Sequence, residues 1–391
     1  MKVAILASHP IQYQVPWFRA LARKMDIHVY FAHRQTSRQQ AEAGFGVEFD
    51  WDVDLLTGYP HTFLHNRSRS PSVNHFFGCD TPEIVTYIKQ QHFDIFLVLG
   101  WYLLSYWQAV LGCHSLRIPV LARGESQLNT KRPIWKKIIK EAVYRFALHQ
   151  FTGYLAIGIR NREYLLHYGV PRERIFFVPY VVDNNWFRQK AQEVYGERIA
   201  FRDLLGLKED AILTLFVGKF IKKKRPLDLV RALYLLRKFG LDVHGLFIGA
   251  GVLKEDIFAL AAQLKVPVHN LGFKNQTELP KYYAMADLLV LPSDSRETWG
   301  LVVNEAMACG LPAVVSDAVG CVPDLIVPGK TGDFYPMGNV EKLADAVRHM
   351  IPLLKTEMVR EALKEKMETY SIGSAVTAFE QAIEITVKRR Y

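Results

Sequence analysis

Two glutamates seven residues apart stand where a predicted strand gives way to a predicted helix. Glu297 falls in the loop before the helix, and Glu305 falls in its first turns. The backbone N–H groups of Gly300, Leu301 and Val302 would lie at the helix start, where such groups lack intrahelical partners and attract anions. We expect a diphosphate there, with the glutamates accepting hydrogen bonds from a sugar or ribose. The alternative is that Glu297 caps the helix and Glu305 is a surface charge.

A basic cluster follows another predicted strand, which Gly218 ends. Residues 219–225 contain five cations within seven positions, among them Lys219 and Lys224. Cations at this place would neutralise a phosphorylated ligand, although a solvated basic turn would also explain them. The pattern is no Walker A loop, because GxxxxGK[ST] is absent. After the next strand, glycines at 249 and 251 are a weaker signal, since any tight strand-to-helix turn favours glycine.

Polar residues also follow two predicted strands of the first half. His9 comes directly after the first strand and is either a site residue or a helix-entry residue. Arg123 and Glu125 come at the end of the strand over residues 118–123. They are candidates for an acceptor site or for the N-terminal side of a cleft. The structural alternative is a salt bridge between Glu125 and Arg123 or a neighbour.

Short apolar strands alternate with helices along the whole chain. Such runs are apolar on both faces, as strands of a helix-covered parallel sheet must be. The alternation predicts a doubly wound α/β architecture. The predicted strands cover residues 2–8, 26–32, 93–100, 118–123, 153–158, 212–218, 243–249, 287–293 and 311–316.

The pattern restarts near residue 180, after a linker that we place at 179–186. We therefore predict two Rossmann-like domains, residues 1–180 and 181–372, that face a central cleft. Ligands of such sheets bind beyond the carboxyl ends of the strands. The helix expected over residues 373–391 could belong to either domain, including by a return to the N-terminal one.

Composition excludes several classes of protein. Half of the 391 residues are apolar, 23% are charged and 12% are aromatic, which argues against a disordered or collagen-like chain. No apolar run reaches the roughly 18 residues of a spanning helix. The short apolar run after Lys2 is interpreted as a strand rather than a signal peptide. Four cysteines without a CxxC pair argue against a disulfide framework and favour the cytosol.

The formal net charge of +10 is unevenly distributed. Residues 1–180 carry +8 of it, and residues 131–145 hold six Lys or Arg against one Glu. Trp135, Ile138 and Ile139 would share one side of a helix there. We expect the helix over residues 131–146 to lie on an anionic membrane surface. The alternative is an ordinary amphipathic helix that packs inward. No nucleic-acid-binding motif accompanies these charges, so no nucleic-acid partner is expected.

The second half resembles the donor-binding domain of the retaining GT-B glycosyltransferases of family 4. The family's Glu-x7-Glu motif is matched by Glu297 and Glu305, and its two basic positions by Lys219 and Lys224. The resemblance covers about residues 178–350. Further motifs occur in the family's order at Gly249-Ala250-Gly251, Leu271-Gly272-Phe273, Ala286-Asp287, 305–314 and 320–332.

This resemblance implies roles for the charged residues. Lys219 and Lys224 would hold the nucleotide diphosphate and stabilise the leaving group. Glu305 would bind the ribose hydroxyls, and Glu297 would contact hydroxyls of the transferred sugar. Glu125 stands where the family often has a histidine, and would orient the donor sugar or meet the acceptor.

The resemblance also implies main-chain contacts. The backbone at Gly300, Leu301 and Val302 would meet the sugar and phosphates, and the backbone near Phe273 would meet the base. Gly218 and Gly251 belong to the same donor site. In the first half the match is weaker, since the family commonly has a glycine-rich loop after the first strand and residues 8–14 contain no glycine.

The reaction so implied has a clear physical demand. Negative charge grows on the departing diphosphate, so fixed cations and helix-start N–H groups are the main catalytic lever. Many metal-dependent transferases use a DxD pair instead. Asp52 and Asp54 fit those letters, but they lie in residues 34–78, which we interpret as a long insertion of weak periodicity. We expect no metal and no cofactor beyond the substrate.

The sequence therefore predicts a retaining, metal-independent glycosyltransferase of hexosyltransferase type. Its donor would be a nucleotide-sugar, with a UDP-sugar favoured over GDP- and ADP-sugars. Its acceptor would be a glycan, a lipid-linked glycan or a small molecule. It would act in the cytoplasm, peripherally on the inner face of a membrane. The alternatives are a nucleotide-sugar epimerase of the same architecture and a catalytically silent nucleotide-sugar-binding subunit.

Overall fold

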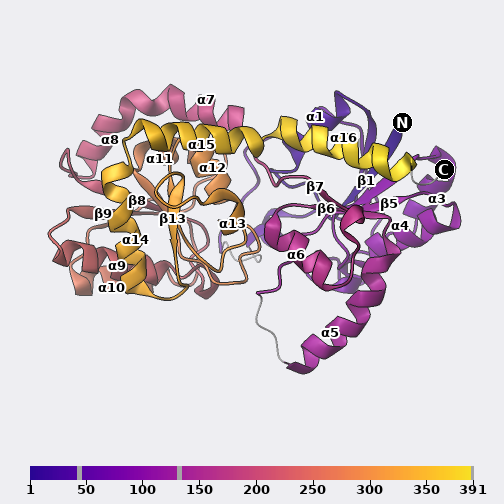
Figure 1. Ribbon diagram of the computed structural model, residues 1–391, viewed down its shortest axis with the longest axis horizontal. Coiled ribbons are helices and arrows are strands. Elements are labelled where there is room, and N and C mark those ends of the chain that lie inside the picture. Colours follow the sequence, from indigo (N-terminus) through magenta and orange to yellow (C-terminus); the bar gives the residue numbers. More distant parts are fainter. Residues whose placement is uncertain (42–45, 130–133, 389–391) are drawn as a thin grey trace. The chain divides into compact units, whose positions relative to one another are not determined.

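The computed structural model describes residues 1–41, 46–129 and 134–388, with only the backbone described for 134–139. The chain divides into two compact units, coloured along the sequence in Figure 1. Unit 1 comprises Met1–Thr36, Asp54–Tyr180 and Ile372–Tyr391, and unit 2 comprises Ser37–Val53 and Val181–Ser371.

Unit 1 contains a seven-stranded sheet in the order β3-β2-β1-β4-β5-β6-β7. Every strand pair in it is parallel. The five strands predicted in this half are confirmed. The two outermost strands were missed because each is only three residues long. The strands are β1 (Lys2–Ala7), β2 (Asp26–Phe31), β3 (His61–Phe63), β4 (Ile95–Val98), β5 (Val120–Ala122), β6 (Gly153–Ala156) and β7 (Ile175–Phe177).

The last helix of the chain belongs to unit 1. It packs against the first helix, and the rings of Trp17 and Phe379 meet with centroids 5.3 Å apart. Trp17 is nearly fully buried by this contact. The helices of unit 1 are α1 (Val15–Ala22), α3 (Ile84–Gln91), α4 (Leu104–Ser115), α5 (Ile134–Ala147), α6 (Ile159–His167) and α16 (Ile372–Lys388).

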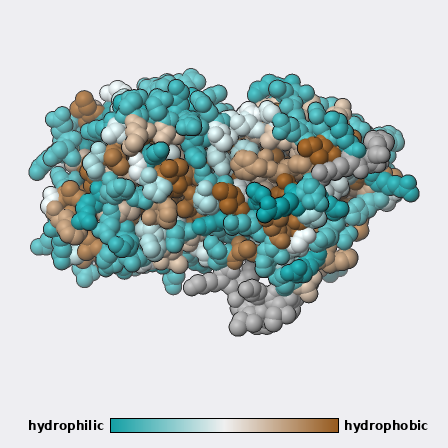
Figure 2. All heavy atoms as spheres, viewed as in Figure 1, coloured by the Kyte–Doolittle hydropathy of each residue, from teal (hydrophilic) through white to brown (hydrophobic). Residues whose placement is uncertain are grey.

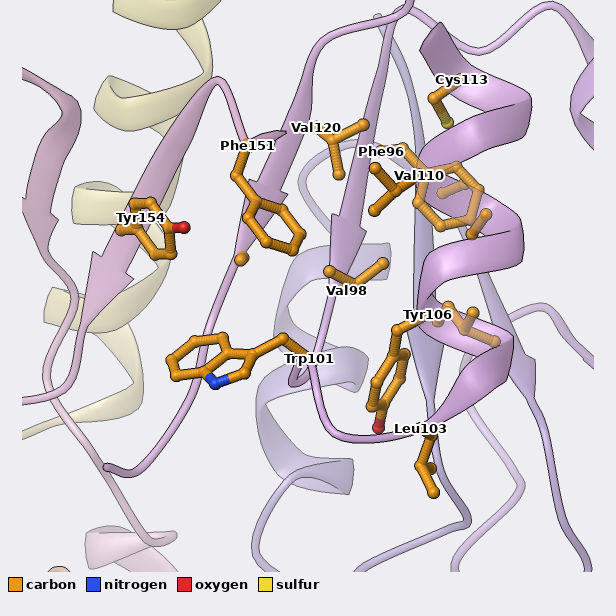
Figure 3. Close-up of a cluster of buried hydrophobic side chains, with 14 of the residues drawn as sticks. Phe96, Val98, Trp101, Leu103, Tyr106, Val110, Cys113, Val120, Phe151 and Tyr154 are labelled. Carbon is orange, nitrogen blue, oxygen red and sulfur yellow. The ribbon is translucent and has the colours of Figure 1, made fainter. Parts of the chain in front are cut away.

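The core of unit 1 lies between α4 and the middle of the sheet. Figure 3 shows Tyr106 and Val110 of α4 beside Phe96 and Val98 of β4, and all four side chains are buried. Both ends of α4 carry apolar side chains toward the sheet, which matches the nearly continuous apolar sequence of β4. The buried helix face and the strand therefore help to position the loop after β4 by packing, and the Trp107 indole N–H donates to the Trp101 carbonyl of that loop at 3.0 Å.

Unit 2 contains a six-stranded sheet in the order β10-β9-β8-β11-β12-β13, again with parallel pairs. The four strands predicted in this half are confirmed. The missed strands are the two at the edges. The strands are β8 (Ile212–Val217), β9 (Val243–Ile248), β10 (Val268–Asn270), β11 (Leu288–Leu291), β12 (Ala313–Ser316) and β13 (Gly332–Tyr335).

Helices cover both faces of this sheet. α9, α10 and α14 form one buried apolar cluster with it, while α7, α11, α12 and α15 pack against one another (Figure 1). The outer side of α15 is hydrophilic in Figure 2. The helices of unit 2 are α2 (Ser37–Gln40), α7 (Asn184–Val194), α8 (Arg198–Leu204), α9 (Pro226–Lys238), α10 (Lys254–Leu264), α11 (Leu279–Met285), α12 (Val302–Ala308), α13 (Val322–Leu325), α14 (Val340–Met350) and α15 (Glu357–Thr369).

Two expectations about organisation need correction. Residues 37–53 were assigned to the N-terminal domain but group with unit 2. The linker is also shorter than residues 179–186, because α7 already begins at Asn184 and Asp183 caps it by accepting from the Trp186 N–H at 3.1 Å. Within the described residues, no helix is both long and apolar enough to cross a membrane.

A buried carboxylate anchors α8 to the sheet of unit 2. Asp287, just before β11, accepts from Arg198 at 2.6 Å and from Arg202 at 2.9 Å. It also accepts the Leu213 N–H of β8 at 2.8 Å. The Asp287 side chain is only 5% exposed, so its charge depends on these partners. Removing one partner of a buried ion pair leaves the other charges uncompensated.

We expect Asp287→Ala to lower the free energy of unfolding by about 3–5 kcal/mol, because two arginines and one backbone N–H lose their acceptor. Urea denaturation followed by circular dichroism measures this change. Asp203→Ala, at an exposed position on α8, is the matched control and should change stability by less than about 0.5 kcal/mol. Equal effects of the two substitutions would contradict the anchoring role.

Candidate functional site

Three loops of unit 2 meet at the carboxyl ends of β8, β9 and β11. The loop after β8 is joined to the loop after β9 by a hydrogen bond from the Phe220 N–H to the Ala250 carbonyl, at 2.7 Å. It is joined to the loop after β11 by one from the Asp294 N–H to the Lys223 carbonyl, at 2.8 Å. These backbone bonds bring the predicted basic cluster, the glycine turn and the first glutamate to one edge of the sheet.

The glycine turn is required by this close approach. Gly251 has φ +146°, and a Cβ added to it would lie 2.7 Å from the Phe220 carbonyl oxygen. Any other residue would push the loops after β8 and β9 apart. The sequence left a simple tight turn as an equal explanation, and the structure shows that backbone-to-backbone packing is the reason for this glycine.

Lysines of the basic cluster converge on Glu297. The Lys224 ammonium lies 2.6 Å from Glu297 Oε2, and the Lys223 ammonium lies 3.6 Å from the same atom. The Lys224 and Glu297 side chains are both 13% exposed. Gly218 directly follows β8, and a Cβ added to it would lie 3.7 Å from the Lys224 side chain. Lys223 was not singled out from the sequence, since its spacing matched no motif.

Burial and charge oppose each other at this cluster. Burial acts to raise the pKa of Glu297, but the ammonium groups of Lys224 and Lys223 outweigh it and lower the pKa below its ordinary value. Burial, together with the neighbouring Lys224 and Lys223, lowers the pKa of Lys219 to about 8. Several cations thus lie close to one another around Glu297, an arrangement that favours a further anion.

The other two cations of the cluster have different surroundings. Arg225 pairs with Asp228 at 2.6 Å, and the same carboxylate lies 3.5 Å from Arg231. Arg225 therefore secures the start of α9. Lys222 is exposed. The alternative of a solvated basic turn holds for Lys222 but not for Lys224, whose ammonium is paired and mostly buried.

The helix after β11 starts where the sequence suggested, but without a side-chain cap. α12 begins at Val302, and Leu301 is its N-cap without a side-chain cap bond. Gly300 has φ +100°, and a Cβ there would lie 2.9 Å from a methyl group of Leu291. The glycine therefore lets the chain turn sharply into the helix. Because Leu301 lacks a side-chain cap, the interpretation of Glu297 as the cap of this helix is wrong.

Glu305 lies in the interior and is not a surface charge, which excludes the structural alternative for this residue. It is 6% exposed. Its Oε2 accepts from the Tyr283 hydroxyl at 2.6 Å, and its Oε1 from the Gln276 amide at 3.4 Å. Burial raises its pKa to about 7, against the opposing effect of these hydrogen bonds. Tyr283 and Gln276 were missed, because a tyrosine on a helix and a glutamine in a loop carry no motif.

The backbone near Phe273 lies beside the glycine turn. The Gly249 N–H donates to the Gly272 carbonyl at 2.8 Å, and the Gly272 N–H donates to Asn270 Oδ1 at 2.9 Å. The loop after β10 is thereby joined to the loop after β9. The Phe273 ring lies against that of Phe49, with centroids 4.5 Å apart.

In unit 1, His9 lies at the carboxyl end of β1. Its Nδ1 is 3.0 Å from the Ser8 hydroxyl. Burial, with a smaller contribution from His33, lowers the pKa of His9 to about 4, so the imidazole is neutral at pH 7. Figure 1 places β1 and β5 within the same sheet, and their carboxyl ends share one edge.

Arg123 and Glu125 follow β5 and meet the end of the unit at Pro179 and Tyr180. Arg123 donates to the Pro179 carbonyl at 3.0 Å, and its guanidinium lies 4.9 Å from the Trp17 ring centroid. Glu125 accepts a hydrogen bond from the Tyr180 hydroxyl. Tyr180 was missed, since it lies in the segment interpreted as linker.

The two carboxylates of the DxD letters have separate structural roles. Asp52 belongs to unit 2 and accepts from the Thr277 N–H at 3.1 Å. Asp54 belongs to unit 1 and accepts from the Leu56 N–H at 3.0 Å. Among the residues that the structure describes, no group of three or more His, Cys, Asp or Glu could hold a metal ion.

The predicted membrane helix is only partly described. Residues 131–133, and the side chains of 134–139, lie outside the described part of the chain. The remainder of α5 exposes Val143 and Phe146. Lys140 lies over the Tyr144 and Tyr164 rings, 4.7 Å from each centroid.

Comparison with known sequences finds glycosyltransferases that are similar to the second half of the chain. Residues 197–368 match the family described as Glycosyl transferases group 1. Relatives named D-inositol 3-phosphate glycosyltransferase, from Mycobacterium bovis and Mycobacterium tuberculosis, are 35% identical over 195 residues. That alignment covers 49% of this chain, and the chain spans only 39% of the length of those relatives. The matched segment is thus similar to glycosyl transferases group 1 domains.

Comparison with solved structures extends over nearly the whole chain. The structure of Anabaena Alr3699/HepE in complex with UDP matches with a TM-score of 0.73 and 15% identity, covering 98% of this chain and 100% of that one. A glycosyltransferase from Rickettsia africae matches with a TM-score of 0.72 and 16% identity, covering 98% of both chains. These likenesses confirm the predicted fold class, two parallel-sheet α/β domains as in GT-B enzymes.

The raised pKa of Glu305 predicts a pH-dependent stability. The folded protein holds this proton more tightly than the unfolded chain, so the contribution is fully present below about 4.5 and is lost as pH rises through about 7. Relative to Glu305→Gln, the wild-type protein should therefore lose roughly 2 kcal/mol of unfolding free energy between pH 5 and pH 8. Denaturant titrations at both pH values measure this difference, with the exposed Glu361→Gln as control. Parallel pH curves for wild type and Glu305→Gln would contradict the assignment.

Proposed function

We propose that this protein, whose residues 197–368 are similar to glycosyl transferases group 1 domains, transfers a sugar from a nucleotide-sugar to an acceptor hydroxyl. The observation that carries the proposal is the set of lysines around Glu297, where the loops after β8 and β11 meet. In our proposal the reaction retains the anomeric configuration and needs no metal. The acceptor is a glycan, a lipid-linked glycan or a small molecule.

A uridine diphosphate donor is our first choice. Structures of Anabaena Alr3699/HepE hold UDP, UDP with glucose, and UDP-glucose, and that protein shares the fold over nearly its full length. A diphosphate suits the site of this chain because Lys219, Lys223 and Lys224 lie together there, with Lys223 and Lys224 paired to Glu297. A UDP-sugar therefore ranks before GDP- and ADP-sugars.

The proposed mechanism uses electrostatics that are in place before the donor binds. As the glycosyl–phosphate bond breaks, negative charge develops on the diphosphate, and Lys219 and Lys224 stabilise it together with the N–H groups at Gly300–Val302. Glu297, kept ionised by the lysines, contacts hydroxyls of the transferred sugar. Glu305 binds the ribose hydroxyls with lone pairs that Tyr283 and Gln276 leave available.

The N-terminal residues would serve the acceptor side. Glu125, oriented by the Tyr180 hydroxyl, is placed to accept a hydrogen bond from a sugar hydroxyl. His9 is neutral at pH 7 and can donate or accept, but it adds no charge that would repel a neutral saccharide. Arg123 holds the Pro179 carbonyl and so supports the position of Tyr180. These roles are part of the proposal.

We also propose that α5 brings the enzyme to the cytosolic face of an anionic membrane. The six cations of residues 131–145 supply the charge, and exposed Val143 and Phe146 supply apolar contact on the described part of the helix. A basic helix with apolar side chains binds such interfaces through electrostatic attraction to anionic lipids and through burial of its apolar side chains. A lipid-linked acceptor would then be held near the enzyme.

The donor proposal predicts that Lys224→Ala weakens UDP binding about 10- to 100-fold, because a charge-assisted contact worth roughly 1.5–3 kcal/mol is lost. Isothermal titration with UDP measures the affinity, and a thermal-shift panel of UDP-, GDP-, ADP- and TDP-sugars identifies the donor. Lys222→Ala, an exposed lysine of the same cluster, is the matched control and should bind as wild type does. If Lys224→Ala and Glu305→Ala both keep wild-type titration curves, the site assignment is wrong.

The reaction class is tested with the donor so identified. Release of nucleotide that depends on added acceptor supports transfer. Conversion of the sugar without acceptor would instead indicate an epimerase, and binding without turnover a silent subunit.

The membrane proposal predicts that Lys136→Glu combined with Lys137→Glu reduces co-sedimentation with vesicles containing phosphatidylserine, since each basic residue near the surface contributes about 1 kcal/mol. Lys254→Glu with Lys364→Glu, on α10 and α15, changes the net charge equally and should leave sedimentation unchanged. Absence of wild-type sedimentation, or equal loss in both double variants, would refute the proposal.

A further inference from the structure

A short segment from the first half of the sequence packs onto the loop that follows β10. Residues 49–52, which we call the 49–52 segment, belong to unit 2 although they lie between β2 and β3 in sequence. The Ser37 hydroxyl donates to Asp50 Oδ1 at 2.7 Å, and this hydrogen bond ties the segment to the start of α2. The segment therefore has a defined position within unit 2.

The 49–52 segment holds both neighbours of Gln276. The Asn275 side-chain amide donates to the Asp50 carbonyl at 2.8 Å. On the other side, the Thr277 N–H donates to the two Asp52 carboxylate oxygens at 3.1 and 3.2 Å, and the Thr277 hydroxyl donates to the same carboxylate. Gln276 thus lies between two tethered residues.

Aromatic packing secures the beginning of the same loop. The Phe49 and Phe273 rings lie with centroids 4.5 Å apart at an interplanar angle of 40°. Trp51 meets Phe49 edge-on, with centroids 5.0 Å apart. Aromatic pairs of this kind stabilise a structure beyond the area that they bury. The ring pair lies where the proposed donor site would receive the base.

The tethered loop leads directly to a buried carboxylate of the site. The Gln276 side chain is 8% exposed, and its amide lies 3.4 Å from Glu305 Oε1. Tyr283 holds the other oxygen of Glu305. The orientation of Glu305 therefore depends on a loop that the 49–52 segment holds from outside.

We propose that the 49–52 segment is a positioning element of the nucleotide site. Asp50 and Asp52 hold Gln276 against Glu305 before the nucleotide arrives, and Phe49 holds Phe273 beside the base. Ordering these groups in advance reduces the entropy lost on binding. This inference rests on the proposed nucleotide binding by unit 2, and it adds residues that the resemblance to glycosyltransferases does not assign.

The test compares two aspartates that are two residues apart. Asp52→Ala removes the tether of Thr277, whereas Asp54→Ala removes a carboxylate that caps the Leu56 N–H in unit 1. Both aspartates are exposed, so neither substitution opens a core. We expect Asp52→Ala to weaken UDP affinity at least about 5-fold by isothermal titration, and Asp54→Ala to leave it within about twofold. Thr277→Val, which removes the donor hydroxyl and keeps the shape, should act in the same direction as Asp52→Ala.

A double-mutant cycle separates positioning from a general structural effect. If Asp52 acts through Gln276, its substitution should cost little further affinity once Gln276→Leu is present, and the combined loss should be smaller than the product of the single losses. Independent effects would multiply. Circular dichroism and the melting temperature without nucleotide show that each variant is folded.

Three different failures can be told apart. If wild-type protein binds UDP and Asp52→Ala binds it equally well, the positioning role is overturned while the proposed function stands. If the two losses in the cycle multiply, the route through Gln276 is overturned. If the wild-type protein binds none of UDP, GDP and ADP, the proposed function fails, and this inference fails with it.

Discussion

The parallel arrangement of strands is the constraint on which the rest of this structure depends. Because neighbouring strands of unit 2 run in the same direction, the loops after β8, β9, β10 and β11 all leave from one edge of the sheet. Residues distant in sequence are thereby collected in one place. The same rule in unit 1 puts His9 and Glu125 at one edge. Helix packing on both faces secures the strands, but their common direction decides which side chains can meet.

Charge balance gives this edge its chemical character. Glu297 is ionised because the ammonium groups of Lys224 and Lys223 lie against it and lower its pKa. Burial and the same two lysines lower the pKa of Lys219 to about 8. At Glu305 burial outweighs the hydrogen bonds and the charge of Lys224, and raises its pKa to about 7. Two carboxylates of one motif thus differ in charge because their surroundings differ. This excess of cations is the basis of the proposed diphosphate binding.

Loop position is decided by local contacts of different kinds. Gly251 permits backbone packing between the loops after β8 and β9, and Gly300 permits the turn into α12. The loop after β10 has neither device on its outer side. It is held instead by Asp50 and Asp52, from a segment that the sequence placed in another domain. Such a tether is a surface arrangement, and its hydrogen bonds matter through what they position more than through the stability they add.

The sequence by itself determined the class of fold, the central strands of both sheets and the charged residues of the proposed donor site. These follow from patterns local in sequence: apolar runs of strand length, glycines at turns and cations after a strand end. The edge strands, the partners of Glu305 and the place of residues 37–53 were not determined in this way. Tyr283 and Gln276 become recognisable only when tertiary packing brings them to Glu305, and Asp52 only when its chain segment meets Thr277. Tertiary structure decided these features because each is a contact between residues far apart in sequence, for which neither partner carries a local signal.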